Sequence, residues 1–259
     1  MSFSDEGALT RGRSWWAVAG PPALALLAVV GLAQFTAMDE WAQSFFWRPG
    51  SGWVVDGNAY GPRLLFYLAP KGMLILFGAG ALLLGAAAWR GWAPERWKVP
   101  ALYMALCMAV IPAAVSGLKA STNVHCPSEL VEYGGEHPHV RLLEAPPPGM
   151  KRGRCFPAGH ASGGFALAGL IHLGRTRRRR WLGAGITLGV GGVMGVYQMA
   201  KGAHFLSHTL ATLALALLLA GILAKLWDHV ARGMGRNGET ARGGVAPGAG
   251  RAVSGEKTL

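Results

Sequence analysis

The chain has 259 residues, of which 51% are hydrophobic and only 15% are charged, and its formal net charge is +12. The apolar residues occur in long blocks rather than at amphipathic spacing, which argues against one large soluble domain. A strongly basic soluble protein would suggest nucleic-acid binding, but here the basic residues gather in alternate loops between apolar blocks. We therefore expect a membrane protein with no nucleic-acid partner.

Six apolar blocks are each close to the roughly 17 to 25 residues that a transmembrane helix needs. In chain order they are Trp15–Met38, Tyr67–Trp89, Pro100–Leu118, Pro157–Leu173, Trp181–Met199 and Phe205–Trp227. The fifth block is rich in glycine, which lets helices approach closely in lipid. The sequence therefore predicts an all-α integral membrane bundle of about six transmembrane helices over residues 15–232.

The basic residues predict how the bundle is oriented. They cluster before the first block, between the second and third, between the fourth and fifth, and after the sixth. The positive-inside rule places these loops in the cytoplasm and residues 39–66, 119–156 and 200–204 outside. Both termini, with the segment 1–14, are then cytoplasmic in a plasma (inner) membrane protein. The tail 233–259 is rich in Gly, Arg and Ala and is expected to be disordered.

The two long outer segments differ in composition. Residues 39–62 are rich in aromatic side chains, which predicts that this loop rests at the membrane surface. Residues 119–156 contain several prolines and a Gly-Gly pair, so we expect a shaped rim or lid rather than a long helix. Cys126 and Cys155 lie at opposite ends of this loop, where an oxidising compartment favours a disulfide between them. The alternative is two unrelated thiols.

Polar residues converge at the outer helix ends. Lys119 ends the third block, His160 begins the fourth, Gln198 and Lys201 end the fifth, and His204 and His208 begin the sixth. His204 and His208 are four apart and share one helix face. The pair fits a nucleophile with its partner, half of a metal site, or two interfacial histidines. A histidine nucleophile suits phosphoryl transfer, with a second histidine protonating the departing oxygen.

These residues resemble the type 2 phosphatidic acid phosphatase family, whose motifs are K-x-x-x-x-x-x-R-P, P-S-G-H and S-R-x-x-x-x-x-H-x-x-x-D. At the same spacings the chain has Lys119 with Cys126-Pro127, then Pro157-Ala158-Gly159-His160, then Gln198, His204 and His208. A divergent bacterial branch with F-P-A-G-H-A-S and G-A-H-F-L-S-H is especially similar. The resemblance implies Lys119 as a phosphate ligand, His160 as the general acid and His204 as the nucleophile that forms a phosphohistidine.

The chain departs from these motifs at four positions. Cys126 stands in place of arginine, Ala158 in place of serine, Gln198 in place of arginine, and His208 in place of the aspartate that orients the nucleophile. Lys201 and Arg154, with the neighbouring Lys151 and Arg152, are candidates to replace the missing positive charge. We expect Gly159, Gln198, Lys201 and Arg154 to help bind phosphate, and His208 to act beside His204.

The leading expectation is a metal-independent lipid phosphatase without a cofactor, acting on a lipid phosphate or pyrophosphate at the outer leaflet. Transfer of the phosphate to another lipid is a close variant. A catalytically silent lipid-binding relative is a second possibility. A third is an outer-face metal-binding membrane protein, because zinc-compatible side chains gather on that side: His125, Cys126, His137, His139, Cys155, His160, His204 and His208.

Overall fold

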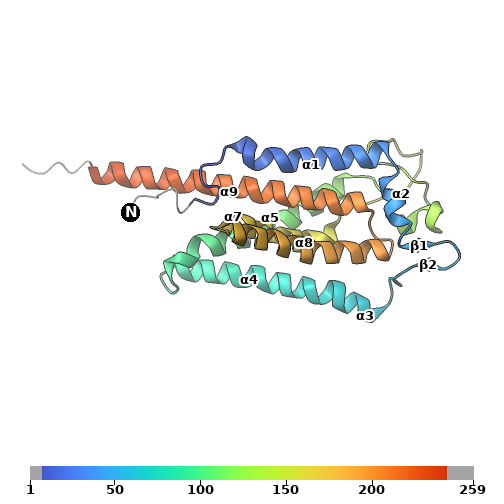
Figure 1. Ribbon diagram of the computed structural model, residues 1–259, viewed down its shortest axis with the longest axis horizontal. Coiled ribbons are helices and arrows are strands. Elements are labelled where there is room, and N and C mark those ends of the chain that lie inside the picture. The colour runs from blue at the N-terminus through green and yellow to red at the C-terminus, as the bar shows by residue number, and fades with distance from the viewer. Residues whose placement is uncertain (1–7, 244–259) are drawn as a thin grey trace, which may run out of the picture.

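Five long apolar helices run along the molecule in the computed structural model, which describes residues 8–243 and gives contacts and burial for residues 8–231 (Figure 1). They are α1 (Trp15–Phe35), α4 (Ala69–Trp89), α5 (Lys98–Ser121), α8 (Arg177–Ala200) and α9 (Leu206–Gly243). Within the described residues, all five are long and apolar enough to cross a membrane. The prediction of an all-α membrane bundle is confirmed.

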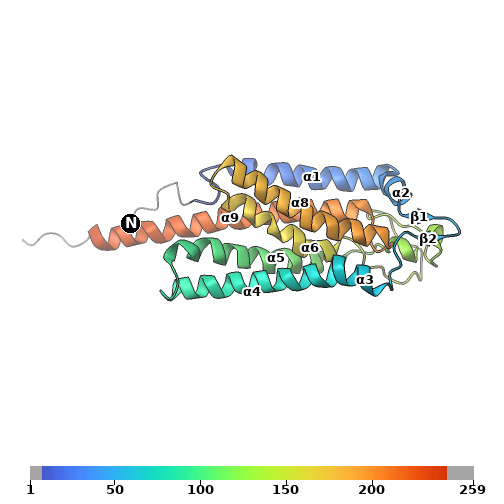
Figure 2. The same cartoon turned by 60° about the horizontal axis from the view of Figure 1, so that its bottom comes forward.

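The fourth predicted block forms a shorter, interrupted helix. It consists of α6 (Gly159–Phe165), the 3-10 turn η6 (Ala166–Ala168) and α7 (Gly169–Leu173). α6 packs against α5, α8 and α9, and Figure 2 shows it enclosed among them. Ala161 is fully buried and Phe165 is 2% exposed. Because protein rather than lipid surrounds this segment, it does not need the length of a full span.

Glycines in α6 and α8 allow the interrupted helix of α6, η6 and α7 to pack closely against α8. A Cβ atom on Gly164 would lie 2.7 Å from the Cα of Gly191, and one on Gly183 would lie 2.9 Å from the backbone of Leu170. A Cβ on Gly185, Gly189 or Gly192 would meet open space. The prediction that glycines serve helix packing therefore applies to one face of α8.

Two helix boundaries differ from the sequence expectation. The helix expected from Tyr67 begins at Tyr60, through α3 (Tyr60–Arg63) and the π-helical η2 (Leu64–Leu68), which lead directly into α4. Pro62 does not prevent this, because proline is tolerated in a first helical turn. Disorder was expected from Gly233, but α9 continues to Gly243, since extending a formed helix avoids the cost of nucleation. The remaining tail lies outside the described residues.

Short elements cap one end of the bundle, at the right of Figure 1. We call this the outer end and the opposite one the inner end, after the sides that the sequence predicts. They are α2 (Met38–Gln43), the antiparallel pair β1 (Trp47–Arg48) and β2 (Gly52–Trp53), and the 3-10 turns η4 (Pro127–Glu129) and η5 (Val131–Tyr133). A further 3-10 turn, η3 (Glu95–Trp97), joins α4 to α5 at the opposite end. The outer loop 119–156 forms no long helix beyond the end of α5, as its prolines predicted.

Not all aromatic residues of the first outer loop face the membrane surface. Trp41 and Phe45 are more than 60% exposed, as expected of interfacial residues. Trp47 and Trp53 instead pack with Tyr133 and with Phe205 in a cluster over the start of α9. The expectation is corrected for these two tryptophans, because the second outer loop supplies an apolar partner that lies far away in the sequence.

At the inner end, the segment before α1 is tied to α9. The backbone N–H groups of Leu9 and Thr10 each donate to the Asp228 carboxylate at 2.8 Å. Leu9 is 6% exposed and belongs to the main apolar core. The predicted N-terminal segment is therefore packed from residue 8 onward.

Asp39 of α2 anchors the first turn of α9. Its carboxylate accepts the Ser207 backbone N–H at 2.7 Å and the Ser207 hydroxyl at 2.5 Å. Burial raises the pKa of Asp39, while the two Ser207 hydrogen bonds oppose that rise. An acceptor at this place satisfies one of the unpaired N–H groups of a helix start.

We expect Asp39→Ala to lower the free energy of unfolding by about 1 to 3 kcal/mol, because it leaves the Ser207 donors without an acceptor. Thermal unfolding of the detergent-solubilised protein measures the change. Asp56→Ala is the matched control, since Asp56 is exposed and accepts only a local hydrogen bond from Asn58. Equal melting temperatures for the two variants would contradict the anchoring role.

Candidate active site

The predicted site residues come together at the outer ends of four elements. Lys119 lies in the last turn of α5, and His160 lies in the first turn of α6. His204 lies in the short connection between α8 and α9, and His208 follows in the first turn of α9. A Cβ atom on Gly159 would lie 3.8 Å from the Lys119 side chain, so this lysine crosses the start of α6.

Two histidines face one another at the centre of this cluster. His160 Nδ1 lies 3.1 Å from His204 Nε2, a distance at which one nitrogen donates a hydrogen bond to the other. His204 is 1% exposed. Burial lowers the pKa of His204 well below its usual range, and His208, His160 and Lys119 lower it further. The His204 ring is therefore neutral and keeps one nitrogen lone pair for reaction.

The other nitrogen of His204 faces Cys155. His204 Nδ1 lies 3.4 Å from Cys155 Sγ, which is within hydrogen-bond distance for a sulfur atom. The His208 ring centroid lies 5.7 Å from that of His204, and no hydrogen bond joins these two rings in the described part of the chain. His208 Nδ1 is buried without a partner. The residue at the aspartate position therefore does not hold His204.

Positive charge surrounds His160. The ammonium groups of Lys119, Lys201 and Lys71 all act electrostatically on its ring. The ion pairs found in residues 8–231 involve none of these three lysines. Unpaired cations around a partly buried histidine favour an anionic ligand.

The remaining predicted phosphate contacts differ in placement. Gln198 is 1% exposed, and neither its amide nitrogen nor its amide oxygen has a hydrogen-bond partner. Arg154 is exposed and makes no described contact with the histidines. Arg152 donates to the carbonyl groups of Ser121 and Thr122 at the end of α5, so it is used elsewhere. Gln198 is therefore buried near the end of α8, whereas Arg154 is exposed in the outer loop 119–156.

The structure joins Cys126 to Cys155 as a disulfide, with their Cα atoms 5.1 Å apart. Cys155, His204 and His208 place their ligand atoms within 4.8 Å of one another, which resembles part of a metal site. A disulfide sulfur is not a thiolate, however, so this group retains only two histidine ligands.

The other outer histidines are engaged separately. His125 uses both ring nitrogens, with Glu129 at 3.0 Å and the Lys151 carbonyl at 2.8 Å. His137 stacks on His125, and their ring centroids lie 4.0 Å apart. The zinc-compatible residues noted in the sequence therefore do not form one four-ligand centre.

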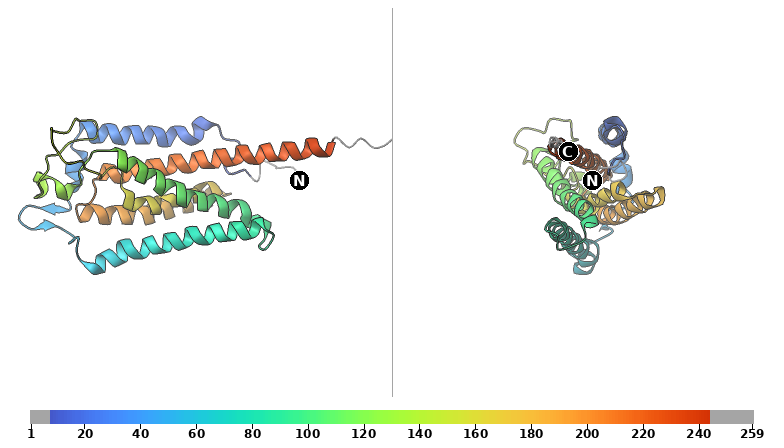
Figure 3. Two further views of the ribbon diagram at one scale, coloured as in Figure 1. Left: turned by 180° about the vertical axis from the view of Figure 1, so that it is seen from behind. Right: turned by 90° about the vertical axis from the view of Figure 1, so that its left-hand side faces the viewer.

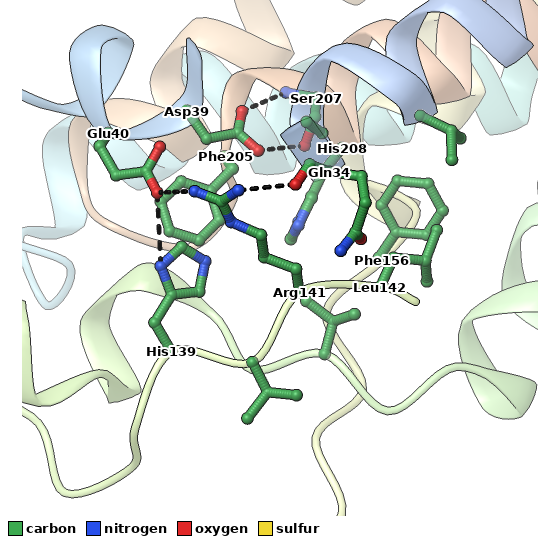
Figure 4. Close-up of a pocket in the computed structure, with 14 residues that line it drawn as sticks. Gln34, Asp39, Glu40, His139, Arg141, Leu142, Phe156, Phe205, Ser207 and His208 are labelled. Carbon is green, nitrogen blue, oxygen red and sulfur yellow. Dashed lines mark hydrogen bonds and ion pairs between the residues drawn. The ribbon is translucent and has the colours of Figure 1, made fainter. Parts of the chain in front are cut away.

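Beside His208 the outer loop is fastened to α1 and α2 (Figure 4). The Arg141 guanidinium donates to the Gln34 carbonyl at 2.6 Å and pairs with Glu40 at 3.1 Å. His139 lies 3.7 Å from the same Glu40 carboxylate. Arg141 and His208 line a small cavity of about 30 Å³, which is large enough to hold water. The loop thus forms a fixed rim over the start of α9.

A long apolar groove leads away from the histidines. It has a volume of about 980 Å³ and runs between α4, α5 and α6. Lys71, Lys119 and His160 line its outer end, while Leu82 and Leu102 lie further along it. Figure 3 shows α4 and α5 meeting at their inner ends and diverging toward the outer end. The groove therefore joins a polar, basic head to an apolar body inside the membrane region.

Fold and site together define a membrane bundle in which a buried histidine, His204, faces the partly buried His160 beside lysine side chains. A family model described as the PAP2 superfamily matches residues 100–231, a little more than half of the chain. The chain belongs to the PAP2 superfamily, and this membership gives it a phosphatase-type function in general. Comparisons with curated proteins and with solved structures found no match.

Proposed function

We propose that this protein is a membrane phosphatase that removes the phosphate of a lipid phosphomonoester or lipid pyrophosphate through a phosphohistidine on His204. The observation that carries the proposal is the 3.1 Å pair of His160 Nδ1 and His204 Nε2 at the basic end of an apolar groove. The groove suits an apolar chain, and Lys71 and Lys119 at its head, with Lys201 acting on His160, suit phosphate.

In the first step, the Nε2 lone pair of His204 attacks phosphorus, and the bond from phosphorus to the lipid oxygen breaks. His160 donates its proton to that oxygen, which leaves as an alcohol or as a lipid monophosphate. In the second step, His160 takes a proton from water, and the resulting hydroxide attacks phosphorus. Inorganic phosphate leaves, and His204 regains its lone pair. No metal enters these steps.

The surrounding groups supply the charge that phosphoryl transfer requires. Lys119 and Lys201 provide ammonium groups, and Gln198 provides an amide N–H that has no partner among residues 8–231. The backbone amides at the start of α6, beginning with Gly159, add donors at a helix terminus. These groups stand in for the two arginines of the family motifs.

We place the reaction at the outer leaflet of the plasma membrane, with both termini in the cytoplasm. The support is the distribution of basic residues, which gather in the loops opposite the histidines. A Cys126–Cys155 disulfide on the histidine side fits an oxidising compartment. Membrane lipids are the expected partners, and no cofactor is required.

The direct test is phosphate release from a panel of lipid phosphates and pyrophosphates by the detergent-purified protein with a chelator present. Turnover in chelator supports the metal-independent reaction. Binding without turnover would support a silent lipid-binding relative instead. Phosphate that appears only on an added lipid acceptor would identify a phosphotransferase.

Ala109→Trp is expected to raise KM for a long-chain lipid pyrophosphate by about tenfold, because a bulky side chain in the groove displaces part of the apolar chain. Hydrolysis of a small water-soluble phosphate ester should remain unchanged, since it does not occupy the groove. Leu76→Trp is the control, because Leu76 is 73% exposed and lies outside the groove lining. Equal effects on both substrates would contradict a lipid-chain groove.

A further inference from the structure

The proposed reaction uses the Nε2 atom of His204. The other ring nitrogen, Nδ1, needs a partner that fixes the tautomer of the ring. An imidazole attacks through Nε2 only when Nδ1 carries the proton, and an acceptor at Nδ1 sets this state. The family places an aspartate four residues after the nucleophile, where this chain has His208. That residue makes no hydrogen bond with His204, as shown above.

Cys155 occupies the place of that acceptor. Its sulfur lies 3.4 Å from His204 Nδ1, which is within hydrogen-bond distance for a sulfur atom. This sulfur is bonded to Cys126 and carries no hydrogen, so it can only accept from the ring. The Nδ1 proton of His204 therefore faces the disulfide.

The Cys155 backbone is held from several sides. Its N–H donates to the Val124 carbonyl at 2.8 Å, and its side chain is fully buried. Two residues earlier, the Gly153 N–H donates to the Asn123 side chain at 2.8 Å. A Cβ atom on Gly153 would lie 2.6 Å from the Val124 carbonyl, so the first and last segments of this loop are in close contact.

The disulfide closes this arrangement. Cys126 is bonded to Cys155, and the Cys126 N–H donates to the Glu129 carboxylate at 3.0 Å. The 29-residue separation between the two cysteines spans the whole outer loop. Without the disulfide, Cys155 would be held by its own N–H bond to the Val124 carbonyl and by bonds of its neighbours. These neighbouring bonds are the Gly153 N–H to the Asn123 side chain and the Thr122 hydroxyl to the Phe156 carbonyl.

We infer that the Cys155 sulfur is the positioning group for His204, and that the Cys126–Cys155 disulfide holds it in place, so turnover depends on the oxidised state of this disulfide. This inference rests on the proposed role of His204 as nucleophile. A neutral disulfide sulfur takes over the orienting task of the carboxylate without adding negative charge beside the buried ring. Reduction by an added dithiol transfers two electrons, gives two thiols, and frees the loop end that carries the Cys155 sulfur.

The kinetic test uses the full-length protein with Cys107→Ala, which removes the remaining buried thiol outside the site. We compare kcat and KM for a lipid pyrophosphate before reduction with dithiothreitol, after reduction, and after reoxidation. Reduction should lower kcat about 10- to 100-fold and leave KM nearly unchanged, since displacement of a catalytic group by about 1 Å has this effect on rate. Cys126→Ser, which preserves Cys155, should match the reduced enzyme.

A second measurement separates positioning from simple unfolding and does not require turnover. The reduced protein must still show a cooperative thermal unfolding transition, and its midpoint must lie above the assay temperature. Histidine ¹⁵N chemical shifts, with His204 assigned by His204→Gln, should show a fixed Nδ1–H tautomer when oxidised and a mixture of tautomers when reduced. The oxidised protein could release no phosphate and still lose the fixed tautomer on reduction. That result would support the positioning role and refute the phosphatase proposal.

Three outcomes would overturn the inference. The first is an unchanged kcat when thiol labelling shows both Cys126 and Cys155 fully reduced. The second is an Nε2–H tautomer of His204 in the oxidised protein, which would mean that the Cys155 sulfur does not accept from Nδ1. The third is a fall in kcat accompanied by loss of the cooperative unfolding transition and an unchanged tautomer.

Discussion

Replacing His204 with alanine is expected to lower phosphate release by at least about 10³-fold, because the covalent route then loses its nucleophile. His204 is buried, and its Nε2 faces His160 at 3.1 Å, so no neighbouring side chain can take its place in the same geometry. The measurement is kcat for release of inorganic phosphate from a lipid phosphate or pyrophosphate in the presence of a chelator.

Labelling makes this prediction specific to the mechanism. Brief reaction with substrate carrying ³²P at the terminal phosphate should label the wild-type chain with an acid-labile, base-stable phosphate, and His204→Ala should remain unlabelled. His137→Ala is the matched control, since His137 lies on the same outer side and stacks on His125 rather than facing His204. Turnover by His204→Ala within a few fold of wild type would refute the phosphohistidine.

Replacing Lys119 with glutamine is expected to lower kcat/KM about 10- to 100-fold. Hydrogen bonds to charged groups contribute roughly 1.5 to 3 kcal/mol each, which corresponds to this range. Lys119 lines the head of the groove and acts on His160 from the end of α5, and it forms none of the described ion pairs. Removing the Lys119 ammonium group is therefore expected to weaken phosphate binding without breaking a structural salt bridge.

Charge and position can be separated at this site. Lys119→Arg keeps a cation and should retain more activity than Lys119→Gln. Lys98→Gln is the control at the opposite end of α5, where Lys98 lies over the Trp89 ring. If Lys119→Gln and Lys98→Gln had equal kcat/KM, Lys119 would not be a phosphate ligand. Melting temperatures of the three variants show whether any loss of activity reflects unfolding.

The sequence alone was sufficient for the fold class and for predicting that Lys119, His160 and His204 lie at one end of the bundle. Long apolar blocks leave few soluble alternatives, so an all-α membrane bundle follows from composition and spacing. Lys119, His160 and His204 each lie at the end of an apolar block, and helices that cross one membrane bring such ends to the same face. The four-residue spacing of His204 and His208 places them close together, although it does not show whether they bond.

Some boundaries could not be predicted because they depend on the surroundings of a segment. The helix through Pro157–Leu173 was expected as an ordinary span, but α6 and α7 are short because other helices enclose them. Local apolar content does not distinguish a protein neighbour from lipid. In the same way, the sequence predicted that Trp47 and Trp53 lie at the membrane interface. In the structure they pack against Tyr133 and Phe205, which are far away in the chain.

The sequence by itself determined which chemical groups reach the outer face: the lysine and histidines at the helix ends and the two cysteines of the long loop. Only the tertiary structure decided how they are used. It placed Nδ1 of His204 against Cys155 rather than His208, and it opened the groove between α4 and α5. Both features depend on contacts between segments far apart in the chain, and residue spacing fixes such contacts only after the helices have packed.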